Sequence, residues 1–260
     1  MMKQRIITAI VLLAVFIPLV AIGGVPFQVL MVAVAAGATY ELLHVAHDPD
    51  PKYYLFAVLG VFIIGSLLFS KKELVDVTYI VLYLIVLLTA GIFDSSMDFM
   101  RLSYYFTSGT LVAVGLRMVY YMRMALGLDY VLLLACATLG ADTFAYFVGR
   151  AIGKHKLNER LSPKKTIEGS IGGIVLGGAL ALAYGFFAKM QLPMVSLVII
   201  SFVLSTTGQI GDLSFSSIKR SFGIKDYSNI FPGHGGILDR FDSIIFNAMV
   251  LGYLLNYIPH

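Results

Sequence analysis

The sequence predicts an all-α, polytopic integral membrane protein with about nine transmembrane helices. Hydrophobic residues make up 58% of the 260 residues and charged residues only 13%, and the mean hydropathy is +0.86. A soluble domain carries about 25% charged residues, so this composition excludes that class. The second observation is a series of apolar runs near the length that crosses a hydrocarbon layer of about 30 Å. They cover residues 5–23, 25–46, 53–70, 74–93, 102–121, 125–149, 167–189, 194–215 and 237–258.

Three of these runs need a separate justification. The first follows the basic residues Lys3 and Arg5, as in a secretory signal peptide, but no small-residue cleavage site stands out, which favours an uncleaved span. Run 102–121 is the weakest prediction, because Arg117 and several tyrosines interrupt it. Run 167–189 carries glycines at four-residue spacing from Gly169 to Gly177, which predicts close packing against another helix. A dimer contact is the alternative for that face.

The spans are expected to form one integrated membrane domain with two parts. Residues 1–122 would be a scaffold, and residues 123–260 would carry the catalytic site. If the N-terminus is cytoplasmic, most of the 19 Lys and Arg residues lie inside, with the richest loops at 150–166 and 216–236. Because the bases fall in short loops, a nucleic-acid partner is excluded. Cys136 is the only cysteine, so no disulfide framework is expected.

The stretch 211–242 differs most from the hydrophobic composition of the rest of the chain. Polar residues at membrane depth are expensive and usually functional. Together with a glycine-rich bend, the acids and bases of this stretch suggest metal-bound phosphates. Its charged residues are Asp212, Lys219, Arg220, Lys225, Asp226, Asp239, Arg240 and Asp242.

Carboxylates within or at the ends of spans predict a divalent metal site. Asp142 and Asp212 lie in apolar runs, and Asp239 and Asp242 open the last run at i, i+3 spacing on one helix face. Mg²⁺ prefers oxygen ligands and usually takes one or two carboxylates together with substrate phosphates. The alternative is an interfacial ion-pair cluster that caps a helix.

The bend before the last run predicts a phosphate contact. Gly235 and Gly236 would leave backbone N–H groups open to a ligand, and the following helix N-terminus favours anions. His234 would add a contact there. The alternative is an ordinary turn in which glycine only provides the backbone conformation.

The basic loop 150–166 gives a second set of candidates. Ser162 and Pro163 are expected to start a helix, with Lys164 and Lys165 in its first turn. Lysine is disfavoured there by the helix dipole unless an anionic ligand arrives. The alternative is plain positive-inside topology. Glu168 could pair with a lysine or join the metal shell.

The cluster of His44, His47, Asp48 and Asp50 resembles a metal site on paper. It lies in a short polar connection with no further partner nearby. We interpret it as a solvated loop.

A longer pattern now carries a family resemblance. It comprises Ser216-Ser217-Ile218-Lys219-Arg220, Lys225-Asp226, Ser228, Phe231-Pro232, His234-Gly235-Gly236-Ile237 and Asp239-Arg240-Phe241-Asp242. It resembles the signature of the phosphatidate cytidylyltransferases, also called CDP-diacylglycerol synthases. The segments SPKKTIEGSIGG and GADTFAYFVGR also resemble that family. The likeness covers the C-terminal half, whereas the first 120 residues match only as hydrophobic spans.

The resemblance implies that CTP and phosphatidic acid condense to CDP-diacylglycerol and pyrophosphate in phospholipid biosynthesis. It also implies a site facing the cytoplasm at the inner membrane, with Mg²⁺ and a second cation such as K⁺. A homodimer is compatible with it. The catalytic candidates are Asp212, Lys219, Arg220, Asp239 and Asp242, and the metal candidates are Asp142, Asp212 and Asp239. The substrate-binding candidates are Ser162, Lys164, Lys165, Thr166, Glu168, Lys225, Asp226, His234, Gly235, Gly236 and Arg240.

Two other functions compete with this reading. A cation-coupled transporter would spread its acids along a pathway and repeat broken helices in both halves. Here the charge is concentrated in one half. Another lipid-phosphate transferase is the second alternative, although the paired-Asp motif of the CDP-alcohol phosphotransferases does not occur here.

Overall fold

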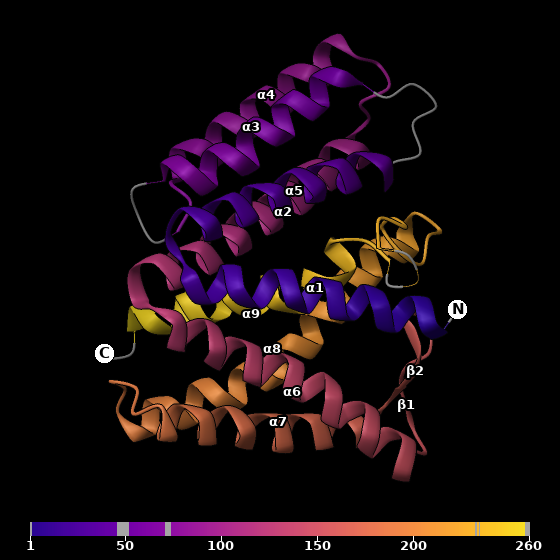
Figure 1. Cartoon of the computed structure of the whole chain (residues 1–260). Coiled ribbons are helices and arrows are strands. Elements are labelled where there is room, and N and C mark those ends of the chain that lie inside the picture. Colours follow the sequence, from indigo (N-terminus) through magenta and orange to yellow (C-terminus); the bar gives the residue numbers. More distant parts are fainter. Residues whose placement is uncertain (1, 46–51, 71–73, 232, 234, 258–260) are drawn as a thin grey trace. The chain divides into compact units, whose positions relative to one another are not determined.

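A computed structural model describes residues 2–45, 52–70, 74–231, 233 and 235–257, with the backbone alone for residues 2–7. Across these residues the chain forms nine α-helices, a π-helical turn η1 (Met122–Leu126) and one short hairpin (Figure 1). The all-α class is therefore confirmed. The chain divides into two compact units, which we describe separately. Unit 1 comprises residues 1–124 and 224–241, and unit 2 comprises residues 125–223 and 242–260.

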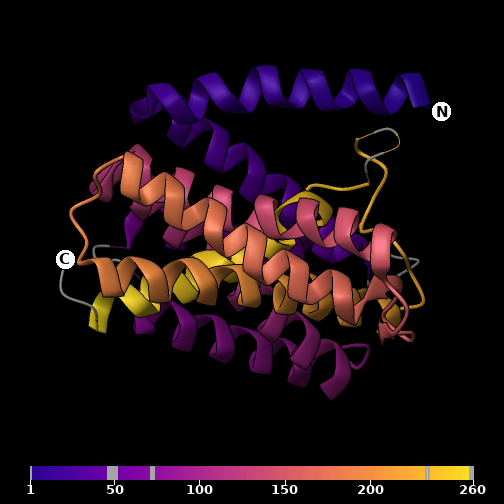
Figure 2. The same cartoon turned by 90° about the horizontal axis from the view of Figure 1, so that it is seen from below.

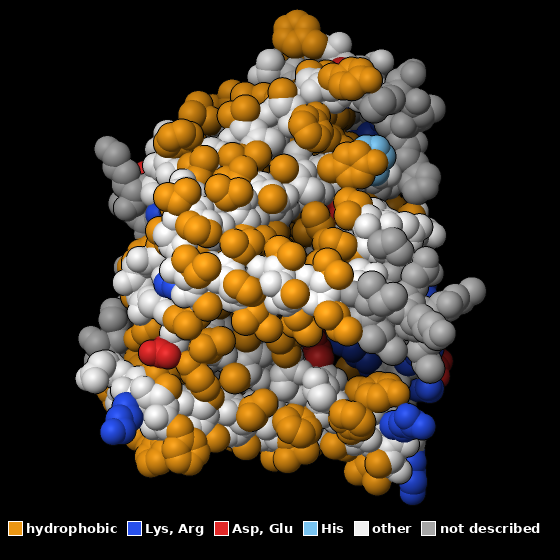
Figure 3. Space-filling view, in the orientation of Figure 1, with side chains coloured by type: hydrophobic (Ala, Val, Ile, Leu, Met, Phe, Trp, Pro, Cys, Tyr) orange, Lys and Arg blue, Asp and Glu red, His pale blue; other side chains and the backbone are white. Residues whose placement is uncertain are grey.

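The apolar helices confirm a multi-pass membrane protein. In the described part of the chain, four helices are long and apolar enough to cross a membrane, and three apolar helices are shorter. Large hydrophobic side chains are exposed along these helices, as the orange surface in Figure 3 shows. Nine membrane crossings stay a prediction. The four long helices are α2 (Gly24–Val45), α6 (Leu128–Ile152), α7 (Ile167–Phe187) and α8 (Met194–Ser221). The shorter ones are the Thr8–Ile22 part of α1 (Met2–Ile22), α3 (Tyr53–Phe69) and α4 (Val77–Phe93).

Acidic side chains define helix ends in unit 1. The Asp76 carboxylate accepts from the backbone N–H of Thr78 at the start of α4. Asp98 does the same for Arg101 at the start of α5 (Phe99–Tyr121). Such caps satisfy N–H groups that a helix leaves without an internal partner. At the end of α4, Lys52 and the Tyr54 hydroxyl donate to Asp94, which holds the pKa of that carboxyl well below its usual range.

Two arginines cap helix C-termini in unit 1 by donating hydrogen bonds to carbonyl groups there. Arg117 of α5 is buried, and its guanidinium donates to the carbonyl oxygens of Leu67 (3.0 Å) and Ser70 (2.7 Å) at the end of α3. Arg123 of η1 donates to the last carbonyls of α1, at Val20 (2.6 Å) and Ala21 (2.8 Å). Helix α5 therefore continues through Arg117, because neighbouring helix carbonyls accept from its guanidinium. Among the described helices, α5 is not one of those that are apolar enough to be a candidate span, so the predicted span 102–121 stays a prediction.

Replacing Arg117 with Met is expected to destabilise unit 1. The change leaves two buried carbonyl groups without their charged donor, which costs about 1–3 kcal/mol. The midpoint of thermal unfolding in detergent should fall relative to the wild-type chain. Lys189→Met, which removes an exposed cation from a loop, is the control and should leave the midpoint unchanged. Equal midpoints for both variants would contradict the capping role.

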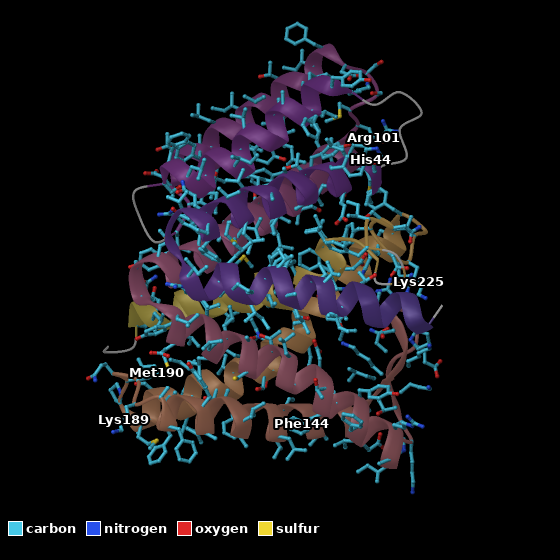
Figure 4. The ribbon with its side chains drawn as sticks, viewed as in Figure 1. His44, Arg101, Phe144, Lys189, Met190 and Lys225 are labelled. Atoms are coloured by element: carbon cyan, nitrogen blue, oxygen red, sulfur yellow. The ribbon has the colours of Figure 1, made fainter. Side chains whose placement is uncertain are left out.

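Glycines bring α6 and α7 into close contact in unit 2, as predicted. A Cβ atom on Gly169 would meet the Ala145 carbonyl oxygen, and one on Gly177 would meet the backbone of Ala141. The glycine face of α7 is thus used for packing against α6. Helix α8 also packs against both α6 and α7 (Figure 2), and the turn between α7 and α8 contains Lys189 and Met190 (Figure 4).

A buried amide connects three helices of unit 2. Asn247 of α9 (Leu238–Tyr257) donates to the Thr138 hydroxyl on α6 and to the Leu204 carbonyl on α8, at 2.7 and 2.8 Å. Its own oxygen accepts from the Thr207 hydroxyl at 2.6 Å. Because each polar atom of this side chain has a partner, the network fixes the register of α9 against α6 and α8.

The predicted helix start at Ser162 and Pro163 is wrong. Ser162–Thr166 is strand β2, which pairs antiparallel with β1 (Lys156–Asn158). The Asn158 side chain accepts from the Leu161 N–H in the connecting turn, and proline is tolerated on such an edge strand. Helix α7 begins only at Ile167, where the Thr166 hydroxyl caps the N–H of Gly169.

Helix α8 continues beyond the predicted boundary at residue 215, and ends at Ser221. Gly223 then adopts a φ of 68°, the left-handed conformation that commonly ends helices. Consequently Ser216, Lys219 and Arg220 lie on a helix, whereas the sequence placed them in a loop.

Candidate active site

A charged cavity lies within unit 2. Its volume is about 340 Å³, and residues of α6, α7 and α8 together with β1 and β2 form its wall. Neutral polar residues, among them Thr166, Ser170 and Gln209, also line it. The cavity thus brings together five residues predicted for the site, namely Asp142, Lys164, Lys165, Thr166 and Asp212, and adds Arg150.

The hairpin places its lysines at this cavity. Lys165 of β2 forms an ion pair with Asp212 of α8, and both side chains are about one-quarter exposed. Ser216, one turn further along α8, donates to the other Asp212 oxygen at 3.3 Å. One group of Lys and Arg side chains lies at the edge where Figure 1 places β1 and β2 (Figure 3). The cavity therefore offers cations for an anionic ligand beside carboxylates for a metal ion.

The carboxylates of unit 2 share one electrostatic environment. Asp142 and Asp242 each interact through space with Asp212. Asp242 is also attracted to Lys219, and both of these side chains are buried. Three carboxylates with nearby cations are a donor set that suits Mg²⁺. Among the described residues, no group of three or more His, Cys, Asp or Glu side chains is close enough to hold a metal ion by itself.

A second set of predicted residues lies in unit 1, in the segment 224–241. One Asp239 oxygen accepts from the backbone N–H groups of Tyr227 and Gly236, each at 2.8 Å. Asp239 thereby joins the two ends of this segment. Lys225, labelled in Figure 4, is exposed along with Asp226 and Arg240.

Glu41 of α2 binds the same segment. Its side chain is fully buried and accepts from the Ser228 hydroxyl at 2.6 Å and from the N–H groups of Ile237 and Leu238 at 2.7 Å each. Leu238 is the first residue of α9. A carboxylate from α2 therefore caps the N-terminus of α9.

This geometry corrects the expectation of open amides at the glycine bend. The N–H of Gly236 is bound by Asp239, and those of Ile237 and Leu238 are bound by Glu41. The helix N-terminus does attract an anion, as expected, but the anion is a protein carboxylate. His234 lies outside the described residues, as do His47, Asp48 and Asp50.

The remaining candidates have local partners. Glu168 accepts from the His155 ring at 2.6 Å and from the backbone N–H groups of Lys154 and His155. It thereby joins the start of β1 to the start of α7. Ser162 begins β2 opposite Asn158, and Arg220 lies exposed in the last turn of α8.

Sequence reasoning missed Arg150 and Glu41. Arg150 looked like one more positive-inside loop residue. Glu41 did leave a signal, since it is the single acid in the apolar run 25–46. A carboxylate inside such a run needs partners, and these can be many residues away along the chain.

The helices and the cavity define a multi-pass membrane protein with a candidate site that combines carboxylates with lysine and arginine side chains. Residues 3–258 match the Cytidylyltransferase family, and the chain belongs to this family. It is therefore a nucleotidyltransferase. The chain is 35% identical over 269 residues to the phosphatidate cytidylyltransferase of Bacillus subtilis (strain 168), covering 98% of this chain and 97% of the relative. It is 36% identical over 265 residues to the phosphatidate cytidylyltransferase of Staphylococcus aureus (strain COL), covering 98% and 99%.

Proposed function

We propose that this chain catalyses the reaction of CTP with phosphatidic acid to give CDP-diacylglycerol and pyrophosphate. The observation that carries the proposal is the unit 2 cavity, where Arg150, Lys164 and Lys165 meet Asp142 and Asp212. The names of the relatives support the same substrates. A transporter has no need for such a cluster of phosphate-binding cations.

The reaction asks the protein mainly to bring two polyanions together. A phosphate oxygen of phosphatidate attacks the α-phosphorus of CTP, and the bond from that phosphorus to the bridging oxygen breaks as pyrophosphate leaves. The attacking phosphate is already ionised at neutral pH, so it needs little help from a general base. Positioning and charge neutralisation then supply most of the rate. Lys164, Lys165 and Arg150 would bind phosphate oxygens, with Arg150 suited to bidentate contacts.

The carboxylates fit a role in holding Mg²⁺. Asp142 and Asp212 would be its protein ligands at the cavity, and CTP phosphates would complete its coordination, as is usual for this ion. When bound, Mg²⁺ supplies charge neutralisation at the phosphates. Lys165, which pairs with Asp212 in the structure, would bind a phosphate oxygen of CTP. The assignment of Asp239 to the metal and the presence of K⁺ stay predictions from the sequence.

The site is proposed to face the cytoplasm at the inner membrane. CTP is a cytoplasmic nucleotide, and the bases of loop 150–166 favour that side. The homodimer also stays a prediction, which the mass of the particle in detergent would test.

The direct test is incorporation of labelled CTP into lipid by the purified protein in phosphatidate micelles, with Mg²⁺ or with a chelator. We expect labelled CDP-diacylglycerol with Mg²⁺ and a loss of product with chelator that added Mg²⁺ reverses. No product from folded protein would overturn the proposal. Labelling of other lipid phosphates would then indicate another transferase, and cation flux in liposomes a transporter.

A further inference from the structure

Glu41, on helix α2, contacts the segment between Tyr227 and Leu238, which lies within the stretch that carries the family resemblance. Its carboxylate contacts both ends of that segment, the Ser228 hydroxyl on one side and the N–H groups of Ile237 and Leu238 on the other. These partners are 187 to 197 residues away along the chain. Between the two ends, the Phe231 N–H donates to the Gly235 carbonyl.

Two glycines allow α2 and this segment to pack closely around Glu41. A Cβ atom on Gly236 would collide with the Glu41 carboxylate, so only glycine lets the segment approach it. One turn earlier on α2, a Cβ atom on Gly37 would collide with the Ile237 side chain. Two close approaches and a buried carboxylate with three donors therefore join α2 to this segment.

We infer that Glu41 is a positioning residue for the transferase reaction, which holds the two ends of this segment together, Ser228 at one end and Ile237 and Leu238 at the other. The inference rests on the proposed function, together with the prediction from the sequence that Gly235 and Gly236 of this segment bind substrate. Glu41 and Asp239 act on the same loop, since each joins residues near position 228 to residues near position 237. Helix α2, which belongs to the part of the chain predicted to be a scaffold, thus orders a segment that was predicted to bind substrate.

Glu41→Gln is the sharpest variant, because it keeps the size of the side chain. One Glu41 oxygen accepts from Ser228 and Ile237, and the other accepts from Leu238. A glutamine has a single carbonyl oxygen, so in either orientation its NH₂ group faces a backbone N–H that also needs an acceptor. At least one donor at the start of α9 loses its partner.

Two measurements on the full-length protein test the inference together. Hydrogen exchange of the amides in Tyr227–Leu238 should become faster in Glu41→Gln, while exchange in α3 to α5 stays unchanged. The kcat/KM for CDP-diacylglycerol formation should fall about tenfold or more, the scale expected when buried donors lose a charged acceptor. Ser228→Ala, which removes one contact from the other side, should cost less in Glu41→Gln than in the wild-type chain.

Thr39→Val is the matched control. Thr39 is equally buried on α2, and among the described residues its hydroxyl donates within the helix, to the Ala35 carbonyl at 2.8 Å. This variant should retain the wild-type rate and exchange. An unchanged rate in Glu41→Gln, with or without faster exchange, would overturn the inference. A wild-type chain without CDP-diacylglycerol activity would overturn the proposed function instead, and the exchange data would still decide whether Glu41 orders the segment.

Discussion

Asp212→Asn is expected to lower the rate of CDP-diacylglycerol formation by about a hundredfold or more, because it removes charge at the reacting phosphates. Asp212 forms the ion pair with Lys165 and accepts from Ser216. Asparagine has the same shape and can still accept from Ser216, so the helices should stay folded. Initial rates at saturating CTP and Mg²⁺, with the unfolding midpoint measured in parallel, check this result.

Asp129→Asn is the control for this experiment. Asp129 also lies in unit 2 and accepts from the Tyr184 hydroxyl at 2.9 Å, but it does not line the cavity. We expect a nearly normal rate from it. If Asp212→Asn kept a comparable rate, or if both variants lost activity equally, the assignment of Asp212 to the site would fail.

Asp239→Asn is expected to have the second-largest effect, again about a hundredfold or more in rate if the carboxylate charge serves catalysis. In the structure one Asp239 oxygen accepts from two backbone N–H groups. The carbonyl oxygen of asparagine can accept from both, so the segment should keep its conformation. This variant therefore tests the effect of the Asp239 charge on the rate without changing the hydrogen bonds that hold the segment.

Asp239→Ala completes the comparison, since alanine loses the charge and both hydrogen bonds. Hydrogen exchange in 227–238 should be close to wild type in Asp239→Asn and faster in Asp239→Ala. Near-normal turnover in Asp239→Asn would refute the metal role, and Asp239 would then be a structural residue of the segment.

The helices could be predicted because their signal is local. Each apolar run has about the length of a span, so the predicted run 194–215 and the observed start of α8 at Met194 coincide. The hairpin was missed for a local reason too. Proline at a helix start is a common pattern, but here the Thr166 cap and pairing with β1 determine the conformation.

The site was less predictable because its contacts are not local. Asp142, Lys165 and Asp212 could be selected as charged residues in or beside apolar runs, and the cavity brings them together. The contact between Glu41 and Leu238 spans 197 residues, and no spacing rule reaches that far. For the same reason the glycine bend looked open to a ligand, although Asp239 accepts from the N–H of Gly236 and Glu41 accepts from those of Ile237 and Leu238.

Arg117 and Arg123, which donate to the C-terminal carbonyls of α3 and α1, affect the prediction of membrane orientation from the positions of basic residues. With an inside N-terminus, the predicted topology places Arg117 and Arg123 on the outer side, so they count against that orientation when every cation has equal weight. Their guanidinium groups bind helix carbonyls, so each is matched by the negative end of a helix dipole. A cation neutralised in this way has little electrostatic preference for either leaflet. Weighting basic residues by whether they are free to meet lipid headgroups strengthens the predicted orientation of this chain.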